Sequence, residues 1–146
     1  GLLWVTKYYF EKCPSWRWQY PYSHAPFVSD LNSFCRSTNV DKLFNRPFDN
    51  KKCITPCVQL LAVLPTACKN LLPTNYQKLL TSPESPIIDY YPTEIHIDMI
   101  NKDVYWKCIP YIPYVDINRV LECVEKIKLS KEENIRNKLF SDYENY

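Results

Sequence analysis

The chain has 146 residues, of which 18 are basic, 16 acidic, 12 proline, 12 tyrosine and one glycine. This length fits a single domain that buries about two-thirds of the surface of its unfolded chain, so we expect residues 1–146 to form one domain with no internal boundary. A net charge of +2 excludes the broad positive field of a self-sufficient nucleic-acid-binding domain, and the scarcity of glycine argues against phosphate-cradling loops and hairpin-rich barrels.

The seven cysteines are odd in number and their spacing shows no disulfide framework, so we expect most thiols to be reduced and several to be buried. Cys53 and Cys57 have the spacing of half a zinc site, but no second pair of ligands follows. The sequence has no apolar run long enough to cross a membrane and no signal peptide, and it opens without methionine inside a helical pattern. We therefore expect an intracellular segment of a longer protein, without a membrane partner.

The first third of the chain predicts two helices and a polar loop. Apolar residues at helical spacing predict a helix over Leu2–Lys12, which ends before Pro14 because a residue that precedes proline disfavours the helical conformation. A short helix is expected over Phe27–Phe34. The polar stretch Ser37–Lys52 is interpreted as a surface loop.

Threonine and proline mark the next helices. Thr55 is expected to cap a helix that begins at Pro56, because the first helical residue does not need the amide hydrogen that proline lacks. Thr74 and Gln77 have the spacing of a capping box, which predicts a helix over Asn75–Leu80. The prolines that follow predict a long irregular segment.

The apolar pattern then changes to a period of two, which predicts a β-hairpin near residues 94–109. The first strand is expected to place apolar side chains on one face and His96 and Asp98 on the other. The second strand is expected at Val104, Trp106 and Cys108.

Two capped helices are predicted after the hairpin. Asp116 marks the start of a helix whose buried stripe includes Val120, and Ser130 with Glu133 forms a capping box for a last helix that runs to about Phe140. The predicted fold is therefore a mostly helical α+β domain with one hairpin and long proline-rich irregular segments.

The segment Cys13–Asp30, CPSWRWQYPYSHAPFVSD, is the most unusual part of the sequence, because it concentrates aromatic residues and prolines and contains no glycine. In an extended conformation Trp16, Trp18 and Tyr20 would share one face, with Arg17 on the other. Such rings commonly fill a core or an interdomain seam, but they can also stack on nucleobases, which contributes about 1–3 kcal/mol per base. The residues leave both roles open.

The acidic residues form no catalytic constellation. They occur singly along the chain, whereas metal-dependent hydrolysis of phosphodiesters needs clustered carboxylates that hold Mg²⁺. Neither of the two histidines has a nucleophilic partner at a fixed spacing. We therefore predict no catalytic residue, no metal ligand and no cofactor within this chain.

These motifs resemble those of a known family. The aromatic segment, with the preceding Trp4-Val5 and Tyr8-Tyr9-Phe10, resembles the signature of the second conserved region of the Xrn-type 5′-to-3′ exoribonucleases. The chain departs from that signature at Gln19 and at Ser23-His24. Further blocks agree in the same order, so that the resemblance covers essentially the whole chain: Gln59-Leu60-Leu61-Ala62-Val63-Leu64-Pro65, Leu72-Pro73 and Ser85-Pro86-Ile87-Ile88-Asp89-Tyr90-Tyr91-Pro92.

The resemblance implies that the parent protein is a Mg²⁺-dependent exoribonuclease that degrades single-stranded RNA with a 5′ monophosphate. In that family the metal-binding carboxylates belong to an upstream region, so this chain alone is expected to be inactive. The second region supports that nuclease core and lines the RNA entrance, where a tryptophan stacks on the first bases. In this sequence the stacking residue is Trp16 or Trp18, and the candidate RNA or interdomain contacts are Arg17, Tyr20, Tyr22 and His24.

The partners that the resemblance implies are single-stranded RNA and the upstream nuclease region. An uncovered aromatic patch would favour self-association of the isolated chain. Two other classes remain open: a stand-alone single-stranded nucleic-acid-binding module, whose affinity falls with salt, and a scaffold whose aromatic groove binds a proline-rich peptide. The sequence does not distinguish a nuclear from a cytoplasmic location.

Overall fold

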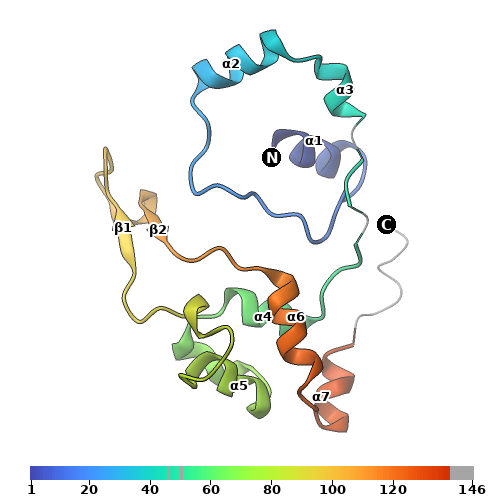
Figure 1. Cartoon of the computed structure of the whole chain (residues 1–146), viewed down its shortest axis with the longest axis vertical. Helices are drawn as coiled ribbons and strands as arrows, with labels where there is room; N and C mark the ends of the chain where they lie inside the picture. Colours follow the sequence, from blue (N-terminus) through green and yellow to red (C-terminus); the bar gives the residue numbers. More distant parts are fainter. Residues whose placement is uncertain (46, 50, 139–146) are drawn as a thin grey trace. The chain divides into compact units, whose positions relative to one another are not determined.

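The computed structural model describes residues 1–45, 47–49 and 51–138, and Figure 1 traces their path. Within this range helices predominate and one two-stranded antiparallel sheet is present, which confirms the predicted mostly helical α+β class with a hairpin. The backbone separates into two compact units, Gly1–Cys53 and the part that begins at Ile54. The expectation of one domain without an internal boundary stays a prediction. None of the described helices is long and apolar enough to span a membrane.

The first unit contains α1 (Leu2–Phe10), α2 (Val28–Ser37) and α3 (Val40–Phe44). The first two confirm the helices predicted from the sequence. The prediction of a loop over Ser37–Lys52 is wrong at α3. There the side chain of Asn39 accepts a hydrogen bond from the Lys42 amide at 3.2 Å and caps a helix of five residues.

The second unit contains α4 (Pro56–Val63), α5 (Thr74–Thr81), α6 (Ile117–Glu125) and α7 (Lys131–Arg136), with strands β1 (His96–Asp98) and β2 (Ile109–Tyr111). Short 3₁₀ helices span Thr66–Leu71, Ile88–Tyr90 and Tyr105–Lys107. Its core lies where α4, α5 and α6 meet and contains these buried side chains: Val58, Leu61, Leu72, Tyr76, Leu79, Leu80, Ile87, Val120, Cys123 and Val124.

The start of α4 is capped by a residue that is distant in sequence. Thr55 occupies the N-cap position and Pro56 the first turn, as predicted, but the Thr55 side chain makes no capping hydrogen bond. Instead, the Asn137 side-chain oxygen accepts the hydrogen bond of the Cys57 amide at 2.9 Å. The C-cap residue of α7 therefore satisfies a backbone donor at the start of α4.

The predicted capping box at Thr74 and Gln77 is wrong, although the helix itself is confirmed. Thr74 is already the first residue of α5, and Pro73 occupies the cap position. The Gln77 amide group turns back and donates to the Leu72 carbonyl at 2.9 Å. Gln77 thus stabilises the backbone before the helix without a reciprocal bond from threonine.

The hairpin is confirmed, but its second strand lies later in the chain than predicted. β1 pairs with β2 in antiparallel register, with Ile97 opposite Pro110. Val104, Trp106 and Cys108 do not form the strand, because the segment coils into a 3₁₀ turn in which Lys107 forms an ion pair with Asp103 at 2.8 Å.

The two caps predicted near the C-terminal end of the described chain are confirmed. The Asp116 side chain accepts a hydrogen bond from the Asn118 amide at 2.9 Å. Ser130 and Glu133 form a reciprocal capping box, and these hydrogen bonds from Ser130 lower the pKa of the Glu133 carboxyl. α7 ends at Arg136, and the predicted end near Phe140 lies outside the described residues.

A bidentate ion pair ties α6 to the proline-rich segment. Arg119 donates to both carboxylate oxygens of Asp89 at 2.8 Å, and its guanidinium carbon lies 5.0 Å from the centre of the Tyr90 ring. The Arg119 hydrogen bonds lower the pKa of the Asp89 carboxyl. Because the pair is exposed, its main effect is to fix the direction of the chain after Pro86, whose carbonyl also accepts from Arg119.

All seven cysteines are free thiols. Burial raises the pKa of the Cys57 and Cys123 thiols, which keeps them protonated and poorly nucleophilic at neutral pH. This arrangement agrees with the expectation of reduced cysteines, several of them covered.

We predict that Asn137→Ala lowers the free energy of unfolding by about 1 kcal/mol, because the Cys57 amide loses its acceptor. Thr55→Ala should cost less than about 0.5 kcal/mol, because no capping bond is lost. Urea unfolding of the full chain followed by circular dichroism measures both. A larger cost for Thr55→Ala than for Asn137→Ala would contradict the long-range cap.

We also predict a difference in alkaline stability. The Tyr91 hydroxyl donates to the Leu61 carbonyl at 2.7 Å, and burial raises the pKa of Tyr91 to about 12. The folded state therefore retains a proton that the unfolded state loses above about pH 10, so this contribution to stability is complete below pH 10 and disappears as the pH approaches 12.

Tyr91→Phe should accordingly be less stable than the native chain at pH 8, by about 1 kcal/mol, and this gap should narrow between pH 10 and 12. Urea titrations at several pH values measure the gap. Tyr105→Phe is the matched control, because Tyr105 is exposed and should show no such gap. A gap that stays constant with pH would contradict the role of the partly buried Tyr91 phenol.

Candidate nucleic-acid interface

The aromatic segment is anchored on helix α1. The Trp4 ring stacks on Tyr8 one turn later, with ring centres 5.2 Å apart and planes 8° from parallel. The Trp4 indole N–H donates to the Ser15 carbonyl at 3.1 Å, and Ser15 is buried. One side chain of the helix therefore fixes the backbone immediately before Trp16.

Trp18 packs between the rings of Trp4 and Phe48. Its ring stacks on Trp4, with centres 6.0 Å apart and planes 20° from parallel, and the ring of Phe48 meets it edge-on at 6.3 Å. Trp18 is half-buried as a result. Both of these rings belong to the same compact unit as Trp18. Trp18 therefore contributes to the packing of that unit, which is the usual role of aromatic residues.

Trp16 differs from Trp18 in its surroundings. Its side chain is 57% exposed, and within the described part of the chain no aromatic ring packs against it. The residue before it, Ser15, is fixed by Trp4, and the residue after it, Arg17, is fixed by the backbone at Lys52. The Trp16 indole is therefore accessible to solvent between two neighbours that are restrained by hydrogen bonds.

The ladder of three rings expected from an extended backbone does not form. Trp16 and Arg17 lie in a bend, and Trp18 pairs with a helix residue instead of its neighbours. Tyr20 meets Tyr22 edge-to-face, with ring centres 5.5 Å apart. The alternation fails because Trp18 stacks on Trp4 of α1, whereas Tyr20 packs against Tyr22.

Tyr20, Tyr22 and His24 form a second, more open group. The Tyr20 hydroxyl donates to the His24 carbonyl at 3.1 Å, and the Tyr20 ring lies against Gly1, where an added Cβ would approach it to 3.3 Å. Tyr22 and the His24 side chain are exposed.

Arg17 is partly used by the fold. Its Nε donates to the Lys52 carbonyl at 2.8 Å, which connects the aromatic segment to the loop around residue 51. Nε is one of the five N–H donors of a guanidinium group, so Arg17 retains the chemistry to bind a phosphate.

Sequence reasoning misses Phe48 and the role of Trp4. Phe48 lies in a stretch interpreted as a polar loop, yet its ring closes the stack against Trp18. Trp4 and Tyr8 are recognisable as neighbours on a helix, but the Trp4–Trp18 contact depends on how the intervening chain turns back.

The described residues offer no metal centre. Within them, no three side chains of the types histidine, cysteine, aspartate and glutamate come together to hold an ion. The arrangement around Trp16 presents an exposed flat ring, and the described residues present no group of carboxylates for metal-assisted hydrolysis.

Comparison with known proteins identifies the family of the chain. Residues 1–144 match the family described as the Xrn1 helical domain. The chain is 44% identical over 139 residues to 5′-3′ exoribonuclease 2 of Schizosaccharomyces pombe, an alignment that covers 94% of this chain and 13% of that protein. It is 43% identical over 139 residues to 5′-3′ exoribonuclease 1 of Homo sapiens, covering 94% of this chain and 8% of that protein.

A third relative, 5′-3′ exoribonuclease 1 of Saccharomyces cerevisiae, is 40% identical over 144 residues, covering 97% of this chain and 9% of that protein. The chain thus spans a small part of the length of the relatives it matches. The agreement extends over nearly the whole of this sequence and confirms the resemblance that its motifs suggest. The chain belongs to the Xrn family of 5′-3′ exoribonucleases and corresponds to its helical domain.

Proposed function

We propose that this chain forms the wall of the RNA entrance in a 5′-to-3′ exoribonuclease, and that Trp16 is the residue that stacks on the bases of single-stranded RNA. The observation that carries this assignment is the contrast between the two tryptophans. Trp18 is stacked between Trp4 and Phe48, whereas Trp16 is exposed between two restrained residues.

Stacking suits an enzyme that must advance along any sequence. Every base presents a flat face, so an indole binds all four bases with similar strength and does not read their edges. Base-paired RNA has both faces of most bases already occupied by neighbours. An exposed, fixed indole at the entrance therefore favours single strands over duplexes.

The hydrolysis itself belongs to other parts of the polypeptide. The substrate is RNA with a 5′ monophosphate, and Mg²⁺ would assist its hydrolysis, as in metal-dependent nucleases generally. The described residues do not fit that ion, because no suitable group of side chains converges. The upstream nuclease region would supply the carboxylates, and this chain would support that region and orient the strand.

Arg17, Tyr20, Tyr22 and His24 complete the proposed surface. Arg17 would contact the RNA backbone with the donors that Lys52 does not use. The exposed Tyr22 and His24 side chains would contact RNA or the nuclease region. Ser23 stands where the family signature has histidine, and His24 stands where it has tyrosine. The hydrogen bond from the Tyr20 hydroxyl to the His24 carbonyl restrains the backbone at this departure.

A proline-rich peptide is a weaker candidate ligand. The groove expected for it needs Trp16, Trp18 and Tyr20 side by side, but Trp18 is committed to Trp4. A peptide nevertheless serves as the competing ligand in the experiment below.

We predict that single-stranded RNA perturbs one of the four tryptophans. In two-dimensional NMR spectra of the full chain, each indole N–H gives its own signal, assigned with single Trp→Phe variants. A short single-stranded RNA should shift the Trp16 signal, because the base lies over that ring. The signals of Trp4 and Trp18 should move less, because their rings stack on each other.

Trp106 is the matched control, because its side chain is 84% exposed but lies in the other compact unit. Trp16→Ala should weaken RNA binding at least about fivefold, and Trp106→Ala should leave it unchanged. A shift of Trp106 alone, an equal shift with duplex RNA, or a Trp16 shift only with a PxxP peptide would contradict the proposal.

We further predict that the chain alone releases no nucleotides from 5′-monophosphate RNA in the presence of Mg²⁺, because its carboxylates do not converge. Incubation with end-labelled RNA, with and without EDTA, measures this. EDTA-sensitive hydrolysis that co-purifies with the chain through two chromatographic steps would contradict the assignment of catalysis to the upstream region.

A further inference from the structure

Two hydrogen bonds restrain the backbone on either side of Trp16. The Trp4 indole N–H donates to the carbonyl of the preceding residue, Ser15, at 3.1 Å. Nε of the following residue, Arg17, donates to the Lys52 carbonyl at 2.8 Å. The second bond is exposed to solvent, whereas the first reaches a residue that is only 4% exposed. A shielded carbonyl that loses its donor cannot turn to water, so the Trp4 bond restrains the backbone more strongly.

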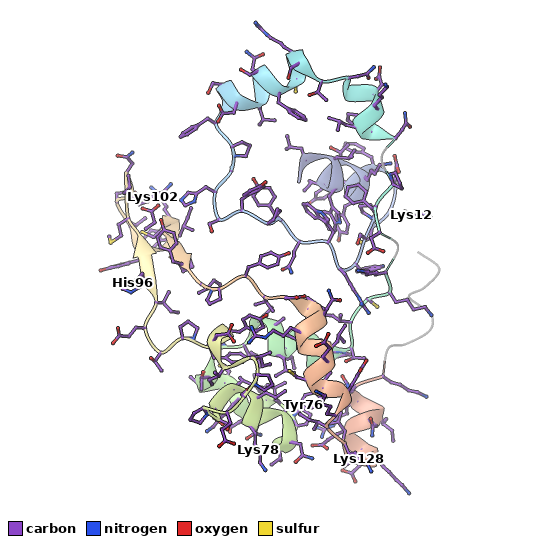
Figure 2. All side chains as sticks on the ribbon, in the orientation of Figure 1. Lys12, Tyr76, Lys78, His96, Lys102 and Lys128 are labelled. Atoms are coloured by element: carbon purple, nitrogen blue, oxygen red, sulfur yellow. The ribbon has the colours of Figure 1, made fainter. Side chains whose placement is uncertain are left out.

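The donor of this bond is itself fixed. The Trp4 ring stacks on both Tyr8 and Trp18, with ring centres 5.2 Å and 6.0 Å away, so its single N–H points in a defined direction. Lys12, labelled in Figure 2, follows the end of α1, and Pro14 then limits the backbone conformation just before the acceptor. The helix, the turn and the acceptor therefore form one restrained loop.

The Trp16 ring depends on this backbone for its orientation. The side chain is 57% exposed, and within residues 1–45, 47–49 and 51–138 no other aromatic ring packs against it. A ring without such packing is ordered mainly by the residue that carries it. Immobilising a free side chain on binding weakens association by about two- to tenfold, and a ring that is ordered beforehand avoids this loss.

We propose that Trp4 is a positioning residue for RNA binding: its indole N–H, acting through the Ser15 carbonyl, holds the Trp16 ring in the orientation in which bases stack on it. This inference rests on the proposed role of Trp16 and adds a residue that itself contacts no RNA. Helix α1 thereby sets the affinity of a site that lies outside it, so a change confined to one N–H should alter RNA binding.

The test removes only this N–H. In benzothienylalanine a sulfur atom replaces the indole N–H and the shape of the ring is kept, so the stacking on Tyr8 and Trp18 remains. Because Cys13 lies just after α1, a synthetic peptide of residues 1–12 can be joined to residues 13–146 by native chemical ligation. The product is the full chain with position 4 altered. Ligation with tryptophan at position 4 gives the native reference.

The first measurement is the mobility of Trp16 in the free chain. When only residues 13–146 carry ¹⁵N, the indole signals are those of Trp16, Trp18 and Trp106. Nuclear relaxation should show a lower order parameter for the Trp16 indole in the sulfur analogue than in the native reference. The Trp106 side chain is 84% exposed and belongs to the other compact unit, so its order parameter should not change.

The second measurement is RNA affinity. The sulfur analogue should bind short single-stranded RNA about two- to tenfold more weakly, because the Trp16 ring must be ordered on binding. In a Trp16→Ala chain the same replacement should have no effect, because the residue through which Trp4 acts is missing. Tyr9→Phe is the matched control, since it removes a hydroxyl from an exposed side chain of the same helix and should leave the affinity native.

The inference is overturned if the sulfur analogue leaves either the Trp16 order parameter or the RNA affinity unchanged. It is also overturned if the analogue weakens binding equally in the native and Trp16→Ala chains, because the effect would then be a general loss of structure. The absence of any Trp16 response to RNA in the native chain overturns the proposed function and this inference together. A normal response there, with no effect of the analogue on affinity, overturns this inference alone.

Discussion

The stacking of Trp4 on Trp18 is the contact on which the proposed interface depends. It brings the aromatic segment back onto α1, and the bond from the Trp4 indole to the Ser15 carbonyl fixes the backbone at the residue before Trp16. This contact partly buries the Trp18 ring, whereas the Trp16 ring stays exposed. Because the chain carries almost no net charge, the proposed binding of RNA would rely on such local surfaces and not on a broad positive field.

In the second unit, hydrogen bonds between residues far apart in the sequence connect the short elements around the apolar core. Its helices have six to nine residues, too few to be stable alone in water, so tertiary contacts must fix them. Asn137 caps α4, Tyr91 bonds to Leu61, and the Asn75 side chain donates to the Lys128 carbonyl at 2.9 Å. These bonds fix the positions of the short elements relative to one another while apolar side chains form the core.

Local signals were sufficient to predict most helices but not the contacts that fix them. Asp116 and Ser130 act on amides two or three residues away, so their caps are readable from the sequence. The cap of α4 comes from a residue 80 positions away, and the second strand depends on how residues 99–108 coil, so neither could be read locally. For the same reason the motif identified Trp16 and Trp18 together, but only the packing of Trp4 separates their environments.

The central claim is that Trp16, and not Trp18, meets the RNA. Ultraviolet cross-linking of the full chain to short single-stranded RNA, followed by mass spectrometry of the peptides, tests it most directly. We expect the cross-linked nucleotide on Trp16, and we expect the cross-link to be lost when the RNA is annealed to its complement. A cross-link on Trp18, or cross-links confined to the hairpin, would contradict it.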